Sequence, residues 1–129
     1  IKKLRISKFI KMIGHKNNAS SYLTEFNCFC ISSIREGLPL SILESFYYKT
    51  PVISTSAGGI PEVISDGKNG SLIKIKDYKN LAKKIKEMMY SDDIQNKFSK
   101  NGLLTLRKNF TNEICALNTL KVYNKVMRK

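Results

Sequence analysis

Two glutamates in one segment of the chain have the chemistry to bind a polyol. Glu36 begins the tetrapeptide E-G-L-P, and Glu44 follows eight residues later. A carboxylate can accept two hydrogen bonds at once, which suits the vicinal diol of a ribose or a hexose. Eight residues span a little over two turns of an α-helix, so both side chains can lie on a common side of the element. The segment therefore predicts a binding site for a hydroxylated ligand.

The neighbours of each glutamate leave a second interpretation open. Glu44 stands among Ile42, Leu43 and Phe46, where an unpaired charge would be costly to bury. The plainer alternative for Glu44 is an exposed position on a helix. For Glu36 the corresponding alternative is a solvated acid in a loop. Both alternatives stay open on the sequence alone.

The backbone around E-G-L-P has the features of a phosphate site. The tetrapeptide follows an apolar segment, residues 28–32, and leads into a helical pattern over residues 39–48. In an α/β sheet such a loop lies at the carboxyl end of a strand, where ligands bind. Gly37 allows close approach of a ligand, and the first N–H groups of the helix point toward an anion at its positive end. The donors predicted for this role are the amides of Leu38, Leu40 and Ser41, because Pro39 has no N–H.

Two further glycine-rich segments carry weaker signals; the first follows the strand predicted at residues 51–55, and the second leads into the strand predicted at residues 71–75. Residues 54–62 read S-T-S-A-G-G-I-P-E, and residues 66–70 read D-G-K-N-G. Neither has the G-x-G-x-x-G pattern of dinucleotide-binding folds or the Lys-Ser/Thr of a P-loop. The second segment reads mainly as turn chemistry.

The elements that must position these residues alternate between short apolar runs and helical patterns. This alternation predicts an α/β fold, a Rossmann-like doubly wound parallel sheet covered by helices on both sides. The two middle strands are apolar on both faces, as expected inside such a sheet. The predicted strands are residues 9–13, 28–32, 51–55 and 71–75, and the helical segments between them are residues 19–26, 39–48 and 61–65.

A helical C-terminal end follows the last predicted strand. Apolar residues recur at helical spacing over residues 78–89, with Asp77 as the N-cap and lysines on the opposite face. A second helix is expected over residues 91–108, with an interruption at Asn101-Gly102. Thr111 begins a third helix, which carries an apolar stripe.

The three cysteines fit no disulfide framework, because their number is odd and their spacing irregular. As strand residues, Cys28 and Cys30 would point to the same face of a sheet. A metal ion needs more ligands than these two thiols and the single histidine, His15, readily supply. We therefore predict reduced, buried cysteines in a cytoplasmic protein, rather than a metal site.

Charge is the strongest feature of the composition, with 23 Lys+Arg against 10 Asp+Glu and a net charge of +13. Three interpretations stay open: a composition bias on solvated faces, an anionic membrane surface, and nucleic acid. Most of the basic residues are lysines and the chain has no Trp, whereas base readout and stacking favour Arg and aromatic side chains. Binding to nucleic acid is therefore the least favoured of the three interpretations.

Four linked motifs resemble the C-terminal domain of the retaining GT-B glycosyltransferases known as the group 1 family. The motifs are E-G-L-P-L-S-I-L-E at residues 36–44, P-V-I-S-T at 51–55, G-G-I-P-E at 58–62 and D-G-K-N-G at 66–70. They occur in the family's order and at its spacing, so together they are far more specific than any glycine pattern alone.

The resemblance implies a role for each matching residue. Glu44 would bind the ribose hydroxyls of a nucleotide-diphosphate-sugar donor, and Glu36 would be the catalytic residue that holds hydroxyls of the donor sugar. The N–H groups that follow Gly37 would meet the diphosphate. The backbone around Gly14 and His15 would border the nucleobase. Such enzymes transfer a hexose with retained configuration and usually need neither a metal ion nor a cofactor.

The resemblance also implies that residues 1–129 form a partial domain. The family's C-terminal domain begins with two further strands and an Arg/Lys diphosphate clamp, and a separate N-terminal domain supplies the acceptor site. We therefore expect this polypeptide alone to have no transferase activity. We also expect its final helix to contact the other domain.

A further expectation concerns a partner and the location of the protein. Many family members act on membrane-proximal acceptors, so the positive charge could hold the parent enzyme peripherally at the inner, cytoplasmic face of an anionic membrane.

The alternative function is a non-catalytic, basic interaction module that keeps the nucleotide-sugar-binding fold.

Overall fold

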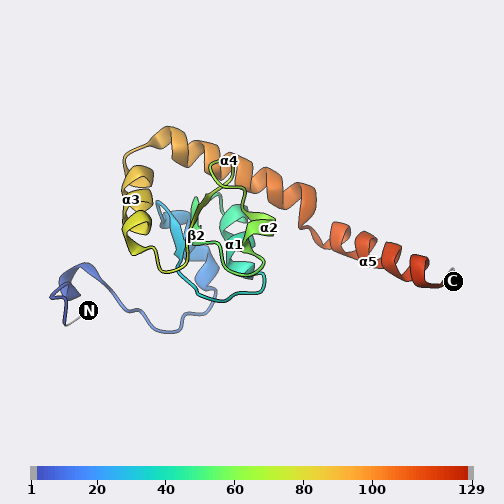
Figure 1. Ribbon diagram of the computed structural model, residues 1–129, viewed down its shortest axis with the longest axis horizontal. Coiled ribbons are helices and arrows are strands. Elements are labelled where there is room, and N and C mark those ends of the chain that lie inside the picture. The colour runs from blue at the N-terminus through green and yellow to red at the C-terminus, as the bar shows by residue number, and fades with distance from the viewer. Residues whose placement is uncertain (1–2, 128–129) are drawn as a thin grey trace.

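A three-stranded parallel sheet forms the centre of the structure, a computed structural model that describes residues 3–127. The strands are β1 (Phe29–Ile31), β2 (Val52–Thr55) and β3 (Ser71–Ile73), in the order β1-β2-β3 (Figure 1). They confirm the predicted strands at 28–32, 51–55 and 71–75 to within two residues at each end. The predicted α/β class is therefore correct.

The register of the sheet brings three loops to one edge. Ile53 in the middle strand lies opposite Cys30 on one side and opposite Ser71 on the other. Because all the strands are parallel, their carboxyl ends meet at the same edge of the sheet. The loops that follow β1, β2 and β3 start there, and they contain the E-G-L-P and G-G segments.

Helices cover both faces of the sheet (Figure 1). Neighbouring side chains of β2 point to opposite faces. Val52 belongs to a core cluster with Ile42 and Phe46, whereas Ile53 packs with Met88 and Phe98. The helices are α1 (Leu40–Tyr47), α2 (Ile60–Val63), α3 (Tyr78–Met89), α4 (Asp92–Asn109) and α5 (Asn112–Met127).

Side-chain caps begin the last three helices at the residues that the sequence indicates. The Asp77 carboxylate accepts a hydrogen bond from the Asn80 amide at 3.0 Å, at the start of α3. The hydroxyls of Ser91 and Thr111 accept bonds from the third amide that follows each of them, at 3.4 and 3.3 Å. Each cap satisfies an amide that the helix leaves free, and so fixes where the helix begins.

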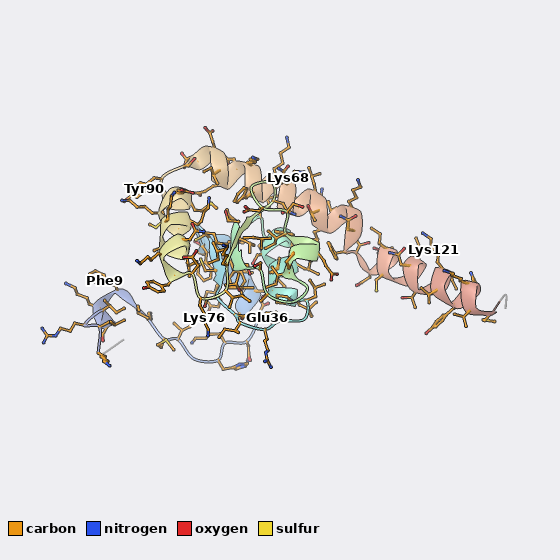
Figure 2. All side chains as sticks on the ribbon, viewed as in Figure 1. Phe9, Glu36, Lys68, Lys76, Tyr90 and Lys121 are labelled. Atoms are coloured by element: carbon orange, nitrogen blue, oxygen red, sulfur yellow. The ribbon has the colours of Figure 1, made fainter. Side chains whose placement is uncertain are left out.

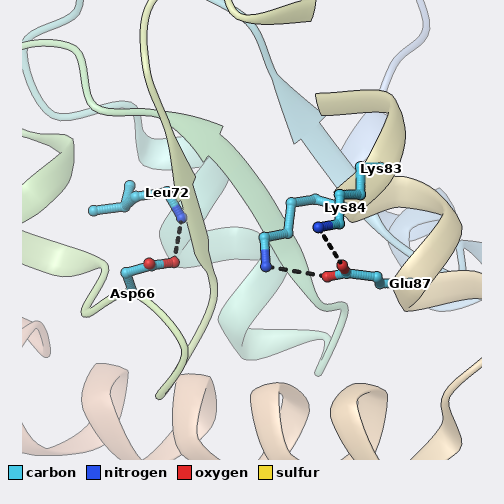
Figure 3. A network of polar contacts seen from close by, with 5 residues as sticks. All are labelled: Asp66, Leu72, Lys83, Lys84 and Glu87. Atoms are coloured by element: carbon cyan, nitrogen blue, oxygen red, sulfur yellow. Dashed lines mark hydrogen bonds and ion pairs between the residues drawn. The ribbon is translucent and has the colours of Figure 1, made fainter. Parts of the chain in front are cut away.

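The D-G-K-N-G segment is a tight turn before β3, as its composition predicts. The Asp66 carboxylate accepts a hydrogen bond from the Leu72 amide at 2.8 Å (Figure 3). Gly67 adopts a positive φ of 70°, and its amide donates to the Gly70 carbonyl at 2.9 Å. These contacts direct the chain from α2 into β3.

The strand predicted at residues 9–13 does not form, and the strand predicted at residues 28–32 is less buried than expected. Phe9 ends a 3-10 turn (Ser7–Phe9), and residues 10–13, which follow it, form no strand. Within the described residues no neighbouring strand pairs with this segment, and its apolar side chains are exposed, Met12 by 81%. Among the strands of the described residues, only β2 is buried along its whole length, and Cys30 in β1 is exposed.

The segment predicted to be helical at residues 19–26 is a 3-10 helix, η2 (Ala19–Glu25). The Ser21 hydroxyl donates to the Asn18 carbonyl at 2.9 Å, and the Thr24 hydroxyl to the Ser21 carbonyl at 3.0 Å. Both bonds span three residues, the spacing of a 3-10 turn. The hydroxyl-rich sequence therefore accounts for the tighter helix.

The expected break at Asn101-Gly102 does not occur, because α4 is continuous from Asp92 to Asn109. Gly102 is buried where α4 crosses α1, and a Cβ on it would lie 2.6 Å from Cδ1 of Phe46. The glycine therefore allows the two helices to approach closely. This contact holds α1, the helix that carries Glu44.

The last helix, α5, extends away from the rest of the domain (Figure 1). Its large apolar side chains are exposed, including Leu117, Leu120 and Tyr123. The predicted contact of this helix with another domain stays a prediction. Within residues 3–127, no helix is long and apolar enough to cross a membrane.

We expect Gly102→Ala to destabilise the domain, although alanine favours a helix over glycine by about 1 kcal/mol. Forcing a methyl group against the buried Phe46 ring costs about 1–3 kcal/mol. The expected net loss in the free energy of unfolding is about 1 kcal/mol, measured by urea denaturation. Asn96→Ala, at an exposed position of α4, is the matched control and should leave stability unchanged or slightly raised. Equal stabilisation by both variants would contradict the close packing.

Candidate functional site

The loops that follow β1 and β2 are locked together through their backbones. The Gly59 amide donates to the Gly37 carbonyl at 2.9 Å. Gly58 has a φ of 53°, and a Cβ on it would overlap the carbonyl oxygen of Glu36. A Cβ on Gly59 would lie 2.8 Å from the Gly37 carbonyl oxygen. The G-G pair is therefore required for this close approach of the two loops, a role that the glycine pattern alone does not reveal.

Hydrogen bonds fix the carboxylate of Glu36 within the same pair of loops. The Ser33 hydroxyl donates to Oε1 of Glu36 at 2.6 Å. The carbonyl of Ser33 accepts from the hydroxyl of Thr55 at 2.6 Å. Thr55 is buried at the end of β2, and Glu36 is half-buried. Glu36 is therefore a loop acid that is partly shielded from solvent and whose carboxylate is held by Ser33.

The first turn of α1 presents amide groups at the carboxyl edge of the sheet. The helix begins at Leu40, one residue later than predicted, with Pro39 as its N-cap residue in an extended conformation. No side chain caps this end of the helix. The amides predicted to meet a phosphate belong to this turn and to the loop before it. The side chains of Leu38 and Leu40 are exposed.

Glu44 lines a cavity of about 240 Å³ between α1 and η2. Ser41, one turn earlier on α1, lines it as well, and Ile13 closes another side. The hydroxyl of the buried Thr50 donates to the Leu23 carbonyl at 2.6 Å and holds η2 beside α1. The remaining lining residues are Ala19, Ser20, Tyr22, Leu23, Phe26 and Phe29. The cavity is therefore largely apolar, with a carboxylate and a few hydroxyl groups in its wall.

The structure separates the predicted site residues into two groups. Glu44 and Ser41 share the cavity, and Gly14 adjoins its lining residue Ile13 with a φ of 64°. Glu36 does not line this cavity and lies in the locked loops. His15 is exposed, and its Nε2 lies 3.3 Å from Oδ1 of Asn17.

Glu44 does not stand in the apolar environment that its neighbours in the sequence suggest. Ile42 and Phe46 are buried on the inner side of α1, but Glu44 is exposed on its other side. The exposed-helix interpretation is therefore correct for its burial. The cavity still gives this exposed carboxylate a defined place.

Three aromatic residues of the cavity wall were not identified from the sequence. Tyr22, Phe26 and Phe29 come from η2, the turn after it and β1. Their signal in the sequence is a cluster of aromatic side chains within eight residues, next to a strand. The cluster becomes part of a cavity wall only when α1 packs against it, so the sequence alone does not identify it as a ligand surface.

The cysteines are less buried than predicted. Cys28 is half-buried, whereas Cys30 and Cys115 are exposed. The Sγ atoms of Cys28 and Cys30 lie 3.8 Å apart, which confirms that they share a face of β1. The hydrogen bond with Cys30 lowers the pKa of Cys28 from 9.0 to about 7, and the same bond raises the pKa of Cys30. Residues 3–127 contain no group of three side chains suited to bind a metal ion.

Two cationic residues lie in the loops at the carboxyl edge of the sheet. Arg35 is exposed directly before Glu36 in the chain. Lys76 follows β3 with a φ of 65° and lines a small cavity with Ser32 and Thr55. Figure 2 shows Glu36 and Lys76 along the same lower edge of the domain, with Lys68 on the opposite side. The edge therefore combines one carboxylate, free helix amides and two cations.

The model of the family described as "Glycosyl transferases group 1" matches residues 1–105. This chain belongs to that family. The match includes all three strands, the locked loops and the whole cavity wall. The family indicated by the sequence motifs is therefore confirmed.

Curated relatives in this glycosyltransferase family are considerably longer than the chain. The uncharacterized glycosyltransferase MJ1178 of Methanocaldococcus jannaschii is 28% identical over 119 residues, which cover 91% of this chain and 34% of that protein. The lipopolysaccharide core biosynthesis glycosyltransferase LpsE of Rhizobium meliloti is 29% identical, over 85% of this chain and 32% of that protein. The chain thus spans about a third of the length of these relatives.

Solved structures show the same fold. The C-terminal domain of the group 1 glycosyltransferase LpcC from Francisella tularensis aligns with a TM-score of 0.73 and 24% identity, over 85% of this chain and 60% of that chain. Anabaena HepE in complex with UDP-glucose aligns with a TM-score of 0.84 and 18% identity, over 99% of this chain and 35% of that chain. The fold is therefore that of the C-terminal, Rossmann-like domain of GT-B enzymes.

We expect Gly58→Ala to destabilise the domain far more than Gly67→Ala does. Both glycines have a positive φ, which costs an alanine about 1–2 kcal/mol. Gly67 has nothing within 4 Å of an added Cβ, whereas the Cβ at Gly58 would overlap the backbone of Glu36. Denaturant titration should therefore show a loss at Gly58 that exceeds the loss at Gly67 by about 2 kcal/mol or more. Equal losses would mean that the loops separate freely.

Proposed function

We propose that this chain is the donor-binding part of a retaining glycosyltransferase, and that it binds a nucleotide-diphosphate sugar between the cavity and the locked loops. The observation that carries the proposal is the cavity itself. Aromatic and aliphatic side chains supply an apolar surface for a flat base, and the carboxylate of Glu44 stands at its wall. A nucleoside has the same combination of an apolar base and a polar diol.

The nucleoside is proposed to lie with its base toward Ile13 and its ribose hydroxyls on Glu44. A carboxylate accepts both hydroxyls of a vicinal diol, and such charge-assisted bonds are the stronger kind. Gly14 and His15 would then border the base through the neighbouring backbone. Ser41 connects this part of the site to the first turn of α1.

The diphosphate is proposed to lie at the first turn of α1. The amides of Leu38, Leu40 and Ser41 and the loop after Gly37 are the donors, and the helix dipole favours an anion there. Arg35 and Lys76 on the same edge would offset further negative charge as the diphosphate leaves. This stabilisation would come from the chain's own groups, so we propose that donor binding needs no added metal ion.

The sugar is proposed to lie against Glu36, whose carboxylate Ser33 holds in place. We propose that this carboxylate binds hydroxyls of a donor hexose and that the transfer retains the configuration of the sugar. Structures of HepE in complex with UDP and with UDP-glucose support a donor of this class, because this chain shares their fold.

The acceptor site and the complete activity are proposed to need a further domain. The chain spans about a third of the relatives, and in it we find the proposed groups for the donor only. We therefore propose that the 129-residue chain binds donor without transferring sugar.

The donor proposal predicts that Glu44→Ala weakens binding of nucleoside diphosphates. Loss of charge-assisted hydrogen bonds to the ribose costs about 1.5–3 kcal/mol, so the Kd should rise about 10- to 100-fold. Isothermal titration against a panel of nucleoside diphosphates, with EDTA present, measures this change. Glu113→Ala on α5 removes the same charge far from the cavity and should leave the Kd unchanged. Unchanged binding by Glu44→Ala would remove the ribose assignment, and a failure of the wild type to bind any nucleotide would favour the non-catalytic module.

We also propose that the positive surface holds the protein peripherally on anionic membranes. The lysines of α3 lie mostly on its solvent face, where Glu87 pairs with Lys84 at 3.0 Å and with Lys83 at 3.9 Å (Figure 3). Other lysines of this face, Lys79 and Lys86, are exposed. The overall excess of positive charge supports a partner with a negative surface.

The membrane proposal predicts that the protein sediments with vesicles that contain phosphatidylserine and not with vesicles of phosphatidylcholine alone. Binding should decrease as salt rises, because about 0.1 M salt screens charges beyond roughly 10 Å. A Lys79→Glu/Lys86→Glu variant should bind less. Equal sedimentation with both kinds of vesicle at low salt would contradict the proposal.

A further inference from the structure

The hydrogen bond between Ser33 and Glu36 is short and joins a hydroxyl to a carboxylate. The Ser33 Oγ to Glu36 Oε1 distance of 2.6 Å lies in the range of charge-assisted bonds. The bond takes one acceptor position on one oxygen of the carboxylate. A carboxylate has about four such positions on its two oxygens. Glu36 therefore keeps most of its capacity to accept bonds from a ligand while its orientation is fixed.

Ser33 is itself held in place from the neighbouring strand. Its carbonyl accepts from the Thr55 hydroxyl at 2.6 Å, and Thr55 is only 2% exposed. The strand β2 that carries Thr55 is buried along its whole length. The Ser33 backbone is thus anchored to a fully buried strand, although it lies in a loop.

The backbone of Glu36 is restrained separately from its side chain. Gly58 packs directly on the Glu36 carbonyl, and the Gly59 amide bonds the next carbonyl, that of Gly37. Backbone and carboxylate of Glu36 are therefore both fixed from β2 and the loop after it. A glutamate without such restraints loses considerable rotamer freedom when it binds a ligand.

We propose that Ser33 is a positioning residue that holds the Glu36 carboxylate ready for the sugar of the donor, with Thr55 fixing Ser33. The proposal rests on the proposed function, in which Glu36 binds sugar hydroxyls. It separates two parts of the site. Ser33 should affect recognition of the sugar and should leave the nucleoside cavity around Glu44 unaffected, because Ser33 does not line that cavity.

The test compares two ligands on the same protein by isothermal titration: a nucleoside diphosphate and the matching nucleotide sugar, for example UDP and UDP-glucose. Their affinity ratio isolates the contribution of the sugar. In Ser33→Ala we expect the Kd for the diphosphate to stay within about twofold, and the sugar contribution to fall about tenfold. Ser33→Thr keeps the hydroxyl and should restore the ratio. Ser65→Ala, at an exposed serine in the loop after α2, should leave both affinities unchanged.

Each other outcome overturns the proposal in a distinguishable way. If Ser33→Ala weakens both ligands equally, Ser33 has only a structural role. If neither affinity changes, the carboxylate does not depend on Ser33. If the wild type binds the diphosphates and gains nothing from the sugar, Glu36 does not hold the sugar, whereas the nucleotide site stands. If the wild type binds no member of the panel of diphosphates and sugars, the proposed function itself fails.

Discussion

The close approach of two backbones determines where the polar groups of this domain lie. The loop after β2 can rest on the loop after β1 only because Gly58 and Gly59 have no side chains. The amide of Gly59 then bonds the carbonyl of Gly37, and the chain that carries Glu36 is held at the carboxyl edge of the sheet. The helix α1 starts from this restrained loop, so its free amides are presented at the same edge. The glycine pair thus sets the geometry of the site through the backbone.

A second constraint acts on the far end of α1. The ring of Phe46 packs against Gly102, which fixes the distance between α1 and α4. The next loop bonds η2 through Thr50 and Leu23. The start of α1 therefore belongs to the locked loops, its middle to the cavity wall, and its end to the core. One eight-residue helix connects the regions proposed for diphosphate, ribose and base.

Much of this fold could be predicted from the sequence, because local patterns and tertiary packing agree. The apolar run of β2 and the caps at Asp77 and Ser91 appear in the structure at the predicted residues or within one of them. The failures occur where a distant contact decides. Gly102 resembles a helix break until Phe46 packs on it, and residues 9–13 have strand composition without a strand to pair with in the described chain.

The candidate site was predictable in its residue types and less so in its geometry. The family motifs identify Glu36 and Glu44. The apolar surroundings expected for Glu44 are wrong, because residues adjacent in the sequence of a helix can lie on different sides of it. The bond from Ser33 to Glu36 is local, but the bond from Thr55 that holds Ser33 joins two separate segments, which spacing does not encode. The aromatic cavity wall likewise exists only after η2 has packed on α1.

The contrast between the two walls of the cavity has a consequence for motion. The α1 wall is part of the core, whereas η2 contributes one buried side chain, Leu23, and one buried hydrogen bond from Thr50. Regions with so few buried contacts open locally at a lower free energy than the core does. The amide protons of residues 19–25 should therefore exchange with solvent sooner than those of β2. The affinity of a ligand that binds against this wall would therefore depend on how well residues 19–25 are ordered.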